Sequence, residues 1–469
     1  MATRASVVSE QSNIPSVVII CKGFDTLAEL TAQGRGTYNL PKAALGRHID
    51  TFTTSELEEQ VRTSLLEQVV KGLTVQPPDA KPKLTEPSLP DIVFKGTFEE
   101  VNEYFYSNEW SDGLPIVPPT VEKVQEFLKF TDRSADDVIG SLLPDSREVN
   151  IWNIAVNGVM AGCRPEYMPI LVALVEVMAD PGFGLRHIGA TPGTLVQTYL
   201  NGPIIKQLDF NYEQGVLRPG FQANISIGRF WRLYVRNVAG FLPKKTDKAT
   251  FGGTFRCVLA ENEDVIRKIG WQPLSVDQGF QAGENVVTVN SCISTDSFFN
   301  VVAEEPEKTL DRLAMRLIDI GVCLTHQSRD SGRLPITHQL IISPAIAEHL
   351  AKHGYTKAAV KQYLWKHAFF PAKRFNLIYG GLHNVKDSLC EFVKIGNLPA
   401  SYCESDDPER MVPLYPNPEA LMLAVSGDPA RDNAYFLTQH GEHGYLTSKK
   451  IILPAEWDKL LKQAKHHTG

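Results

Sequence analysis

The sequence lacks the features of a membrane protein and of a nucleic-acid-binding protein. Its apolar runs, such as Val17–Cys21, are far shorter than the roughly 18 apolar residues that a membrane-spanning helix needs. Lys and Arg number 47 against 54 Asp and Glu, which gives a formal net charge of −7. Binding to phosphate backbones requires clustered positive charge instead. We therefore expect no membrane partner, no nucleic-acid partner and a cytoplasmic location.

Cysteine is also scarce and unpatterned. The seven cysteines form no CxxC pair and no doublet with zinc-ligand spacing. They are Cys21, Cys163, Cys257, Cys292, Cys323, Cys390 and Cys403. We expect reduced thiols, as is usual in the cytosol.

The chain does contain enough apolar residues for about two or three ordinary cores, because 43% of its 469 residues are hydrophobic. Apolar β-branched runs alternate with segments of helical spacing, which predicts an α/β fold. Five prolines and several charges favour a linker at 76–95. We expect a small βαβα unit at 1–75, a central α/β domain at 96–293 and a C-terminal α/β domain at 294–469. No internal repeat is visible in the sequence.

Capping signals and hydrophobic periods locate the individual elements. Thr97 and Glu100 have the spacing of a capping box, and Thr120 begins the next helix. The predicted helices are 25–32, 55–73, 97–107, 120–128, 149–161, 165–178, 221–238, 306–320, 345–352 and 357–368. The predicted strands are 16–21, 48–52, 194–200, 256–260, 286–293, 339–343 and 421–425.

A proline-stiffened loop at 111–119 contains the first candidate site residues. Asp112 lies between Trp110 and this rigid run, so we expect a partly desolvated carboxylate that could act as a general base. Ser111 is a candidate for substrate binding. Alternatively, the Asp112 side chain only binds amides of its own turn.

Cys163 lies between two predicted helices. If Pro165 begins the second helix, the thiol is close to unpaired N-terminal amides, which favour the thiolate and so a nucleophile. The alternative is a buried structural cysteine that packs as a small hydrophobic residue.

A glycine-rich loop at 181–194 leads into a predicted buried strand. Its glycines would allow the backbone to approach a ligand closely, although the dinucleotide and P-loop spacings are absent. We expect His187 to act as an acid or orienting group, and Thr191 and Thr194 to bind substrate. The loop could equally be an ordinary long connection.

Arg229, Arg232 and Arg236 follow each other at helical spacing, which places three guanidinium groups along one stripe. Such a stripe is suited to carboxylate or phosphate oxygens, with Asn201 and Asn224 as further substrate-binding candidates. A solvated or salt-bridged polar helix face is the alternative.

Glu261 directly follows the predicted strand 256–260, and open α/β sheets bind ligands at strand ends. It could act as a general base or a metal ligand, or it could simply face water. The spacing of these carboxylates, and of the isolated pair His440 and His443, does not require a metal. We predict no metal site and identify no cofactor.

Several long motifs resemble a family of proteins that contain a UGSC-like domain. The motifs are residues 111–120, 161–167, 201–203 and 421–424. Residues 16–72 resemble the downstream half of the UGSC-like domain itself. That domain is named for a selenocysteine-or-Cys, Gly, Ser, Cys motif and is similar to the selenoprotein component of glycine reductase. The redox motif is missing here, since residues 1–75 contain only Cys21.

Three functions are compatible with these observations. The first is an enzyme that transforms a small carboxylate-bearing metabolite by acid–base or nucleophilic, lyase-like chemistry. Asp112 or Glu261 would be the base, Cys163 the nucleophile and the arginines the substrate anchor. The second is a thiol-redox component that works with a partner subunit, and the third is a non-catalytic scaffold. A homo-oligomer is expected in each case.

Overall fold

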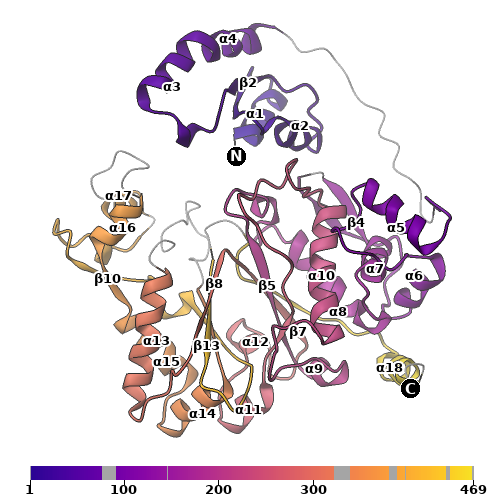
Figure 1. Cartoon of the computed structure of the whole chain (residues 1–469), viewed down its shortest axis with the longest axis vertical. Helices are drawn as coiled ribbons and strands as arrows, with labels where there is room; N and C mark the ends of the chain where they lie inside the picture. Colours follow the sequence, from indigo (N-terminus) through magenta and orange to yellow (C-terminus); the bar gives the residue numbers. More distant parts are fainter. Residues whose placement is uncertain are drawn as a thin grey trace.

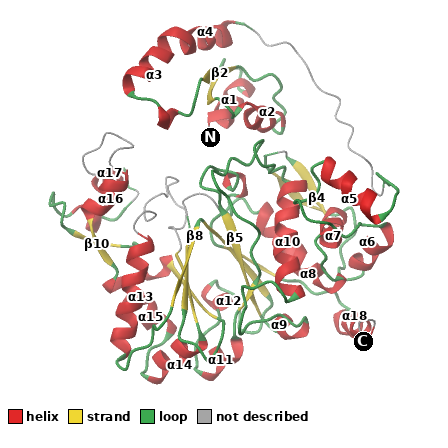
Figure 2. Ribbon diagram, viewed as in Figure 1, coloured by secondary structure: helices red, strands yellow, loops and turns green. Residues whose placement is uncertain are grey.

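The computed structural model describes residues 2–75, 91–144, 146–321, 338–379, 388–396, 398–439 and 444–466. They form an α/β structure of helices around several sheets (Figures 1 and 2). Most of the predicted linker lies outside these residues, as do His440 and His443. Within the described part of the chain, every helix is too short or too polar to cross a bilayer.

The N-terminal unit consists of short helices around a parallel strand pair. Its elements are α1 (Ala2–Gln11), β1 (Val18–Cys21), α2 (Asp25–Gln33), β2 (Lys42–Leu45), η1 (Ile49–Thr51), α3 (Thr54–Gln60), η2 (Val61–Leu65) and α4 (Leu66–Thr74). The predicted strand at 48–52 is wrong. The second strand is β2, because Ala43 and Leu45 provide the alternating buried positions, and it pairs in parallel with β1.

The central unit contains five of the predicted helices and three of the predicted strands, together with additional short elements. Its helices are α5 (Phe98–Ser107), α6 (Val121–Leu128), α7 (Ile151–Met160), η3 (Pro165–Tyr167), α8 (Met168–Ala179), η4 (Leu185–His187), α9 (Ile204–Gln207), α10 (Gln222–Asn237), α11 (Glu263–Lys268) and α12 (Leu274–Asp277). Its strands are β3 (Val138–Leu142), β4 (Arg147–Asn150), β5 (Leu195–Asn201), β6 (Leu259–Ala260) and β7 (Val286–Cys292). The capping box of Thr97 and Glu100 is confirmed, and Thr120 caps α6.

The C-terminal third alternates helices and strands as predicted, with several additional elements. The helices are α13 (Pro306–Gly321), α14 (Pro344–Lys352), α15 (Lys357–His367), α16 (Ala372–Tyr379), α17 (Ser388–Lys394), η5 (Ala400–Cys403), η6 (Pro418–Ala420) and α18 (Trp457–His466). The strands are β8 (Ser294–Phe298), β9 (His338–Ile342), β10 (Phe369–Pro371), β11 (Met411–Pro413), β12 (Leu421–Val425), β13 (Ala434–Thr438) and β14 (Thr447–Lys450).

Two four-stranded sheets form the centre of the molecule and share one topology. In the first, of order β14-β7-β5-β6, β5 is parallel to β6 and antiparallel to β7, which is antiparallel to β14. In the second, of order β12-β9-β13-β8, β9 is parallel to β12 and antiparallel to β13, which is antiparallel to β8. The two sheets are therefore a structural repeat that the sequence does not reveal.

The repeats exchange their last strands. Along the chain, β5, β6, β7 and β8 form one series, while β9, β12, β13 and β14 form the other. β8 nevertheless pairs with β13 of the second sheet, and β14 pairs with β7 of the first. Residues 444–466, which we expected in a C-terminal domain, thus return to the central unit, where Trp457 and Leu461 of α18 join its core.

Helices cover the outer face of each sheet, and apolar side chains join the inner faces. Figure 1 shows the sheets side by side, with α8 and α10 on one side and α13 and α15 on the other. A core between the sheets includes Tyr199 and Cys292 from the first and Ile341 and Leu437 from the second. The Tyr199 hydroxyl donates to Gln339 Oε1 at 2.8 Å. The pairing of the sheets therefore fixes the position of β5.

The structure corrects the expectation that all cysteines are reduced. Cys390 and Cys403 form a disulfide, because α17 and η5 place their Cα atoms 4.9 Å apart. Cys21, Cys163, Cys257 and Cys292 are free thiols.

Candidate functional site

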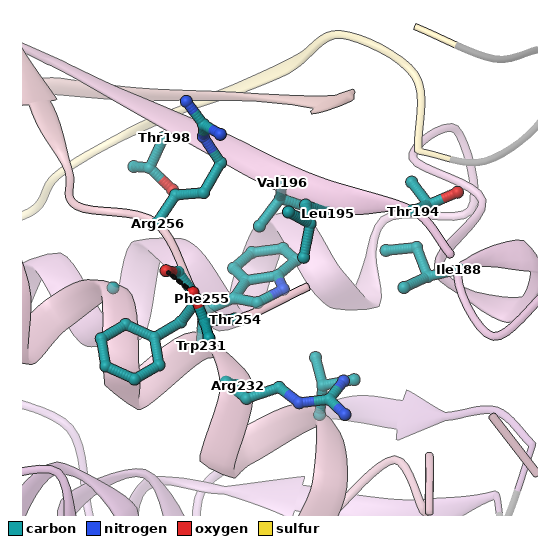
Figure 3. Close-up of a pocket in the computed structure, with 12 residues that line it drawn as sticks. Ile188, Thr194, Leu195, Val196, Thr198, Trp231, Arg232, Thr254, Phe255 and Arg256 are labelled. Carbon is teal, nitrogen blue, oxygen red and sulfur yellow. Dashed lines mark hydrogen bonds between the residues drawn. The ribbon is translucent and has the colours of Figure 1, made fainter. Parts of the chain in front are cut away.

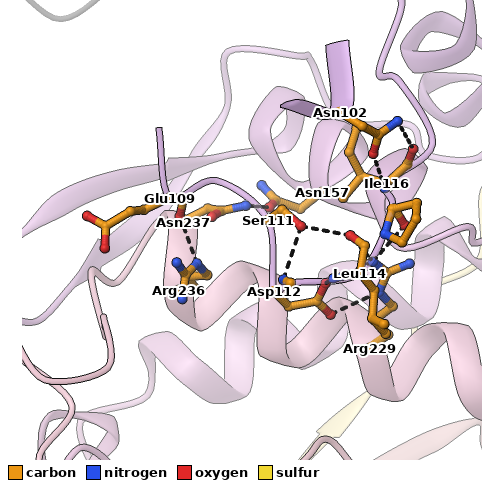
Figure 4. Close-up of polar contacts among 12 residues, drawn as sticks. Asn102, Glu109, Ser111, Asp112, Leu114, Ile116, Asn157, Arg229, Arg236 and Asn237 are labelled. Carbon is orange, nitrogen blue, oxygen red and sulfur yellow. Dashed lines mark hydrogen bonds and ion pairs between the residues drawn. The ribbon is translucent and has the colours of Figure 1, made fainter. Parts of the chain in front are cut away.

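The loop at 111–119 is held against α10 by an ion pair (Figure 4). Asp112 accepts hydrogen bonds from Arg229 Nε at 3.0 Å and from Arg229 Nη2 at 2.8 Å. The same Nη2 donates to the carbonyls of Leu114, at 3.2 Å, and Pro115, at 2.9 Å. The Asp112 side chain is only 7% exposed. This bidentate geometry anchors the loop and leaves the carboxylate poorly placed to act as a base.

Other polar groups of this loop also bind the loop itself. Ser111 Oγ donates to the Leu114 carbonyl at 2.7 Å and accepts from Gly113 N at 3.2 Å. Asp112 Oδ1 accepts from Leu114 N at 3.3 Å. Asn102 supports the end of the loop, where its Oδ1 accepts from Ile116 N at 2.7 Å (Figure 4). The alternative interpretation of Asp112, as a residue that binds its own turn, is the one that these contacts support.

The three arginines of α10 contact three different segments. Arg229 binds the loop at 111–115, Arg232 pairs with Asp247 at 3.3 Å, and Arg236 Nε donates to the Glu109 carbonyl at 2.7 Å. The predicted stripe exists, but its guanidinium groups do not converge on one ligand. Burial, followed by repulsion from Arg232, lowers the pKa of Arg236.

Cys163 is a buried thiol rather than an activated thiolate. Burial raises its pKa to about 12, against smaller opposite effects of Ser226 and Arg229. Pro165 begins η3 as expected, but desolvation outweighs the nearby helix amides. Its burial and raised pKa favour the alternative interpretation of Cys163 as a buried structural residue.

Glu261 is fully buried and accepts hydrogen bonds from three segments. The donors are Leu274 N at 2.7 Å, Asn201 Nδ2 at 2.7 Å and Val425 N at 3.2 Å. Lys357 Nζ lies 4.0 Å away. Burial raises the pKa of Glu261, against the effect of Lys357. The carboxylate therefore joins the ends of β5, β6 and β12 and does not face substrate or water.

Asn224 is likewise occupied by backbone contacts. Its Oδ1 accepts from Asn211 N at 3.0 Å, while its Nδ2 donates to the carbonyls of Asn211, at 2.9 Å, and Val258, at 2.8 Å. Both donor hydrogens are used and the residue is fully buried. These contacts favour a structural role for Asn224.

The glycines of the loop at 181–194 approach other backbone segments instead of a ligand. A Cβ at Gly189 would lie 2.9 Å from the Thr246 carbonyl oxygen, and one at Gly193 would lie 2.8 Å from Gly252. His187 Nε2 accepts from Arg186 Nε at 2.9 Å. Thr191 is exposed, whereas Thr194 is only 8% exposed and its hydroxyl has no hydrogen-bond partner. Among these candidates, Thr194 is the one that enters a pocket.

That pocket lies between β5, α10 and the segment 254–256 (Figure 3). Its space, including the open solvent at its mouth, is about 450 Å³. The lining residues are Ile188, Thr194, Leu195, Val196, Thr198, Gly228, Trp231, Arg232, Val235, Thr254, Phe255 and Arg256. We refer to it as the β5–α10 pocket.

Most polar groups of the β5–α10 pocket are hydrogen-bond donors. The Thr194 hydroxyl, the Thr198 hydroxyl and the Trp231 indole N–H form no hydrogen bond with any described residue. Arg232 adds a guanidinium that it shares with Asp247, whose Oδ2 lies 3.3 and 3.4 Å from the two terminal nitrogens. Donors without acceptors favour a ligand with oxygen acceptors.

Arg256 is a second cation of the pocket, and its partners are neutral. Its Nε donates to Gln197 Oε1 at 2.9 Å and its Nη2 to the Tyr435 hydroxyl at 3.0 Å. Within the described part of the chain, no carboxylate oxygen lies within 4.0 Å of the Arg256 guanidinium, so Arg256 forms no ion pair there. Our sequence analysis missed Arg256, Thr198 and Trp231. The available signal was an arginine at the start of the apolar run Cys257–Ala260.

Gly228 explains how α10 and the segment 254–256 approach closely enough to form one pocket. A Cβ at this position would lie 2.0 Å from the Arg256 carbonyl oxygen, which is impossible without a shift of the backbone. The absence of a side chain at this position therefore allows Arg256 to approach Trp231 and Arg232.

The described residues include no group of three or more His, Cys, Asp or Glu side chains that could hold a metal ion. Asp112 pairs with Arg229, whereas Glu261 and Glu263 both accept from Asn201 Nδ2, at 2.7 and 3.1 Å.

The comparisons with known proteins concern the N-terminal unit. No curated protein and no solved structure matches the chain. The model of the UGSC family matches residues 1–75, which span α1 to α4 and do not include the β5–α10 pocket. This chain is therefore a UGSC-like domain-containing protein.

Proposed function

We propose that this protein is a cytoplasmic enzyme that binds and transforms a small carboxylate-bearing metabolite in the β5–α10 pocket. The observation that carries the proposal is Arg256, a partly buried guanidinium whose hydrogen-bond partners, Gln197 and Tyr435, are both neutral. A cation taken out of water without a counter-charge is costly, and an anionic ligand would offset that cost.

The remaining groups of the pocket support an anionic ligand. Thr194, Thr198 and Trp231 offer donors, while the pocket's other cation, Arg232, already has Asp247 as its partner. One uncompensated positive charge, surrounded by neutral donors, fits a single carboxylate.

The acid–base chemistry in this proposal falls to His187. It immediately precedes Ile188, which lines the pocket, and its Nε2 accepts from Arg186. Asp112, Cys163 and Glu261 are left out, because their side chains are committed to structural contacts or buried.

The alternatives are less well supported. A thiol-redox component would need a reactive thiolate, whereas burial raises the pKa of Cys163 to about 12 and that of Cys292 to about 11. A scaffold would have no use for an uncompensated arginine in a pocket. Homo-oligomerisation stays part of the proposal.

Ligand-induced stabilisation tests the proposal. A panel of small monocarboxylates and the matching uncharged amides is screened by thermal shift, with hits followed by product analysis. We expect carboxylates, and not amides, to raise the melting temperature. Arg256→Gln, which retains hydrogen-bonding ability, should weaken carboxylate binding at least about tenfold, as for a lost charge-assisted hydrogen bond.

Arg267→Gln is the matched control, because the Arg267 side chain is 77% exposed. It should bind like the wild type. Equal carboxylate affinity in Arg256→Gln and in the wild type would refute the proposed site. Binding without any turnover would remove the catalytic part, and normal turnover in His187→Ala would remove the role of His187.

A further inference from the structure

The two ends of the β5–α10 pocket differ in charge. Figure 3 shows Thr198 and Arg256 towards one end and Thr194 with Ile188 towards the other, with the Trp231 indole between them. The first end has the guanidinium without a carboxylate partner. The second has an apolar side chain and the Thr194 hydroxyl, which is 8% exposed and unpartnered.

We propose that the ligand is a hydroxy- or oxo-carboxylate with a flat, apolar middle. Its carboxylate binds at Arg256 and Thr198, its middle lies along Trp231, and its uncharged oxygen binds Thr194. This inference rests on the proposed function and specifies the substrate class of the same pocket.

The Thr194 end selects against a second charge. Arg232 is the other cation of the pocket, and its charge is already neutralised by Asp247. A second carboxylate at this end would lose its hydration beside Ile188 without gaining a counter-ion. A hydroxyl or carbonyl oxygen, in contrast, satisfies the Thr194 hydroxyl at a much smaller desolvation cost.

The middle of the pocket favours a planar group. Trp231 is 6% exposed, and Leu195 and Val196 of β5 contribute further apolar surface. Indole faces pack well against flat π-systems.

The test uses three probes that share one ring: benzoate, 4-hydroxybenzoate and terephthalate. Titration calorimetry on the full chain should show 4-hydroxybenzoate binding about 3- to 10-fold more tightly than benzoate, as expected for one net hydrogen bond. Terephthalate should bind more weakly than benzoate. Thr194→Val keeps the shape of the side chain and should abolish the preference for the hydroxyl, with benzoate affinity unchanged.

Thr191→Val is the control, because this exposed threonine lies in the same loop but outside the pocket lining. It should keep the wild-type preference. If benzoate binds through Arg256 but 4-hydroxybenzoate has no advantage, or if Thr194→Val keeps that advantage, the inference fails while the proposed function stands. Tighter binding of terephthalate than of benzoate also overturns the inference. If no carboxylate binds at all, both the inference and the proposed function are overturned.

Discussion

The Glu261 carboxylate accepts three N–H groups inside the core, so its protonation is linked to folding. Burial raises its pKa above 4.5, so the folded protein holds this proton at a pH where the unfolded chain has released it. The contribution of Glu261 to stability is therefore fully present below about pH 4.5 and is lost as the pH rises through the higher folded pKa.

Replacement of this carboxyl should change both stability and its pH dependence. Glu261→Gln places an NH2 group among donors, so we expect it to lower the free energy of unfolding by about 1–3 kcal/mol at pH 7. It should also remove the loss of stability that Glu261 causes as the pH rises from about 4.5 towards 7. Urea unfolding at both values measures the two effects. Glu263→Gln, at a half-buried neighbour, is the control, and an identical pH slope in Glu261→Gln and wild type would contradict the linkage.

At the scale of elements, α10 shows how one glycine positions a pocket. Alanine is normally the better helix residue, by about 1 kcal/mol. At position 228, however, the added Cβ meets the Arg256 carbonyl oxygen at 2.0 Å. We expect Gly228→Ala to lower the free energy of unfolding by about 1–3 kcal/mol, as overpacking does, and to weaken carboxylate binding.

Chemical denaturation and calorimetry of the same variant measure both effects. Ser226→Ala alters the same helix without adding atoms and should leave the binding of carboxylates intact. A Gly228→Ala protein that is more stable than the wild type would show that the segment 254–256 moves away easily.

Elements with strong local signals could be predicted from the sequence, and elements defined by distant partners could not. The capping box at Thr97 and the almost wholly apolar α8 are local features, and both are confirmed. β14 is polar and half-exposed, and it becomes a strand only because β7 pairs with it. The true position of β2 also depends on the partner strand β1.

The candidate site residues divide in the same way. Thr194 and Arg232 were selected from patterns in their own segments of the sequence. Arg256 becomes a candidate only through its tertiary contacts with α10, Gln197 and Tyr435. Asp112 and Arg229 were both selected, but single-sequence patterns do not show that two candidates bind each other. Burial, which decides the chemistry of Cys163 and Glu261, likewise comes from tertiary packing.

At the scale of the whole molecule, strand exchange couples the two sheets. β8 and β14 each complete the sheet of the other repeat, so neither sheet is whole when the other is unfolded. We expect one cooperative unfolding transition for both sheets. Phe436→Ala in β13, a fully buried position, should destabilise the protein by about 3–5 kcal/mol.

Two variants that each retain a single tryptophan report on the unfolding of the two repeats. One keeps Trp231 in α10 and the other keeps Trp365 in α15. The urea midpoints of both probes should fall together in Phe436→Ala. A midpoint that falls only for Trp365 would show that the repeats unfold independently.

The strand exchange also determines when the first sheet can be completed during synthesis on the ribosome. β5, β6 and β7 leave the exit tunnel long before residues 447–450, which form the missing edge strand β14. Until then β7 presents an unpaired edge, the kind of surface that recruits other nascent chains. The sheet that contains the pocket can thus be completed only near the end of translation. A premature stop codon shortly before β14 would release an aggregation-prone chain, even though this chain contains most of the pocket's residues.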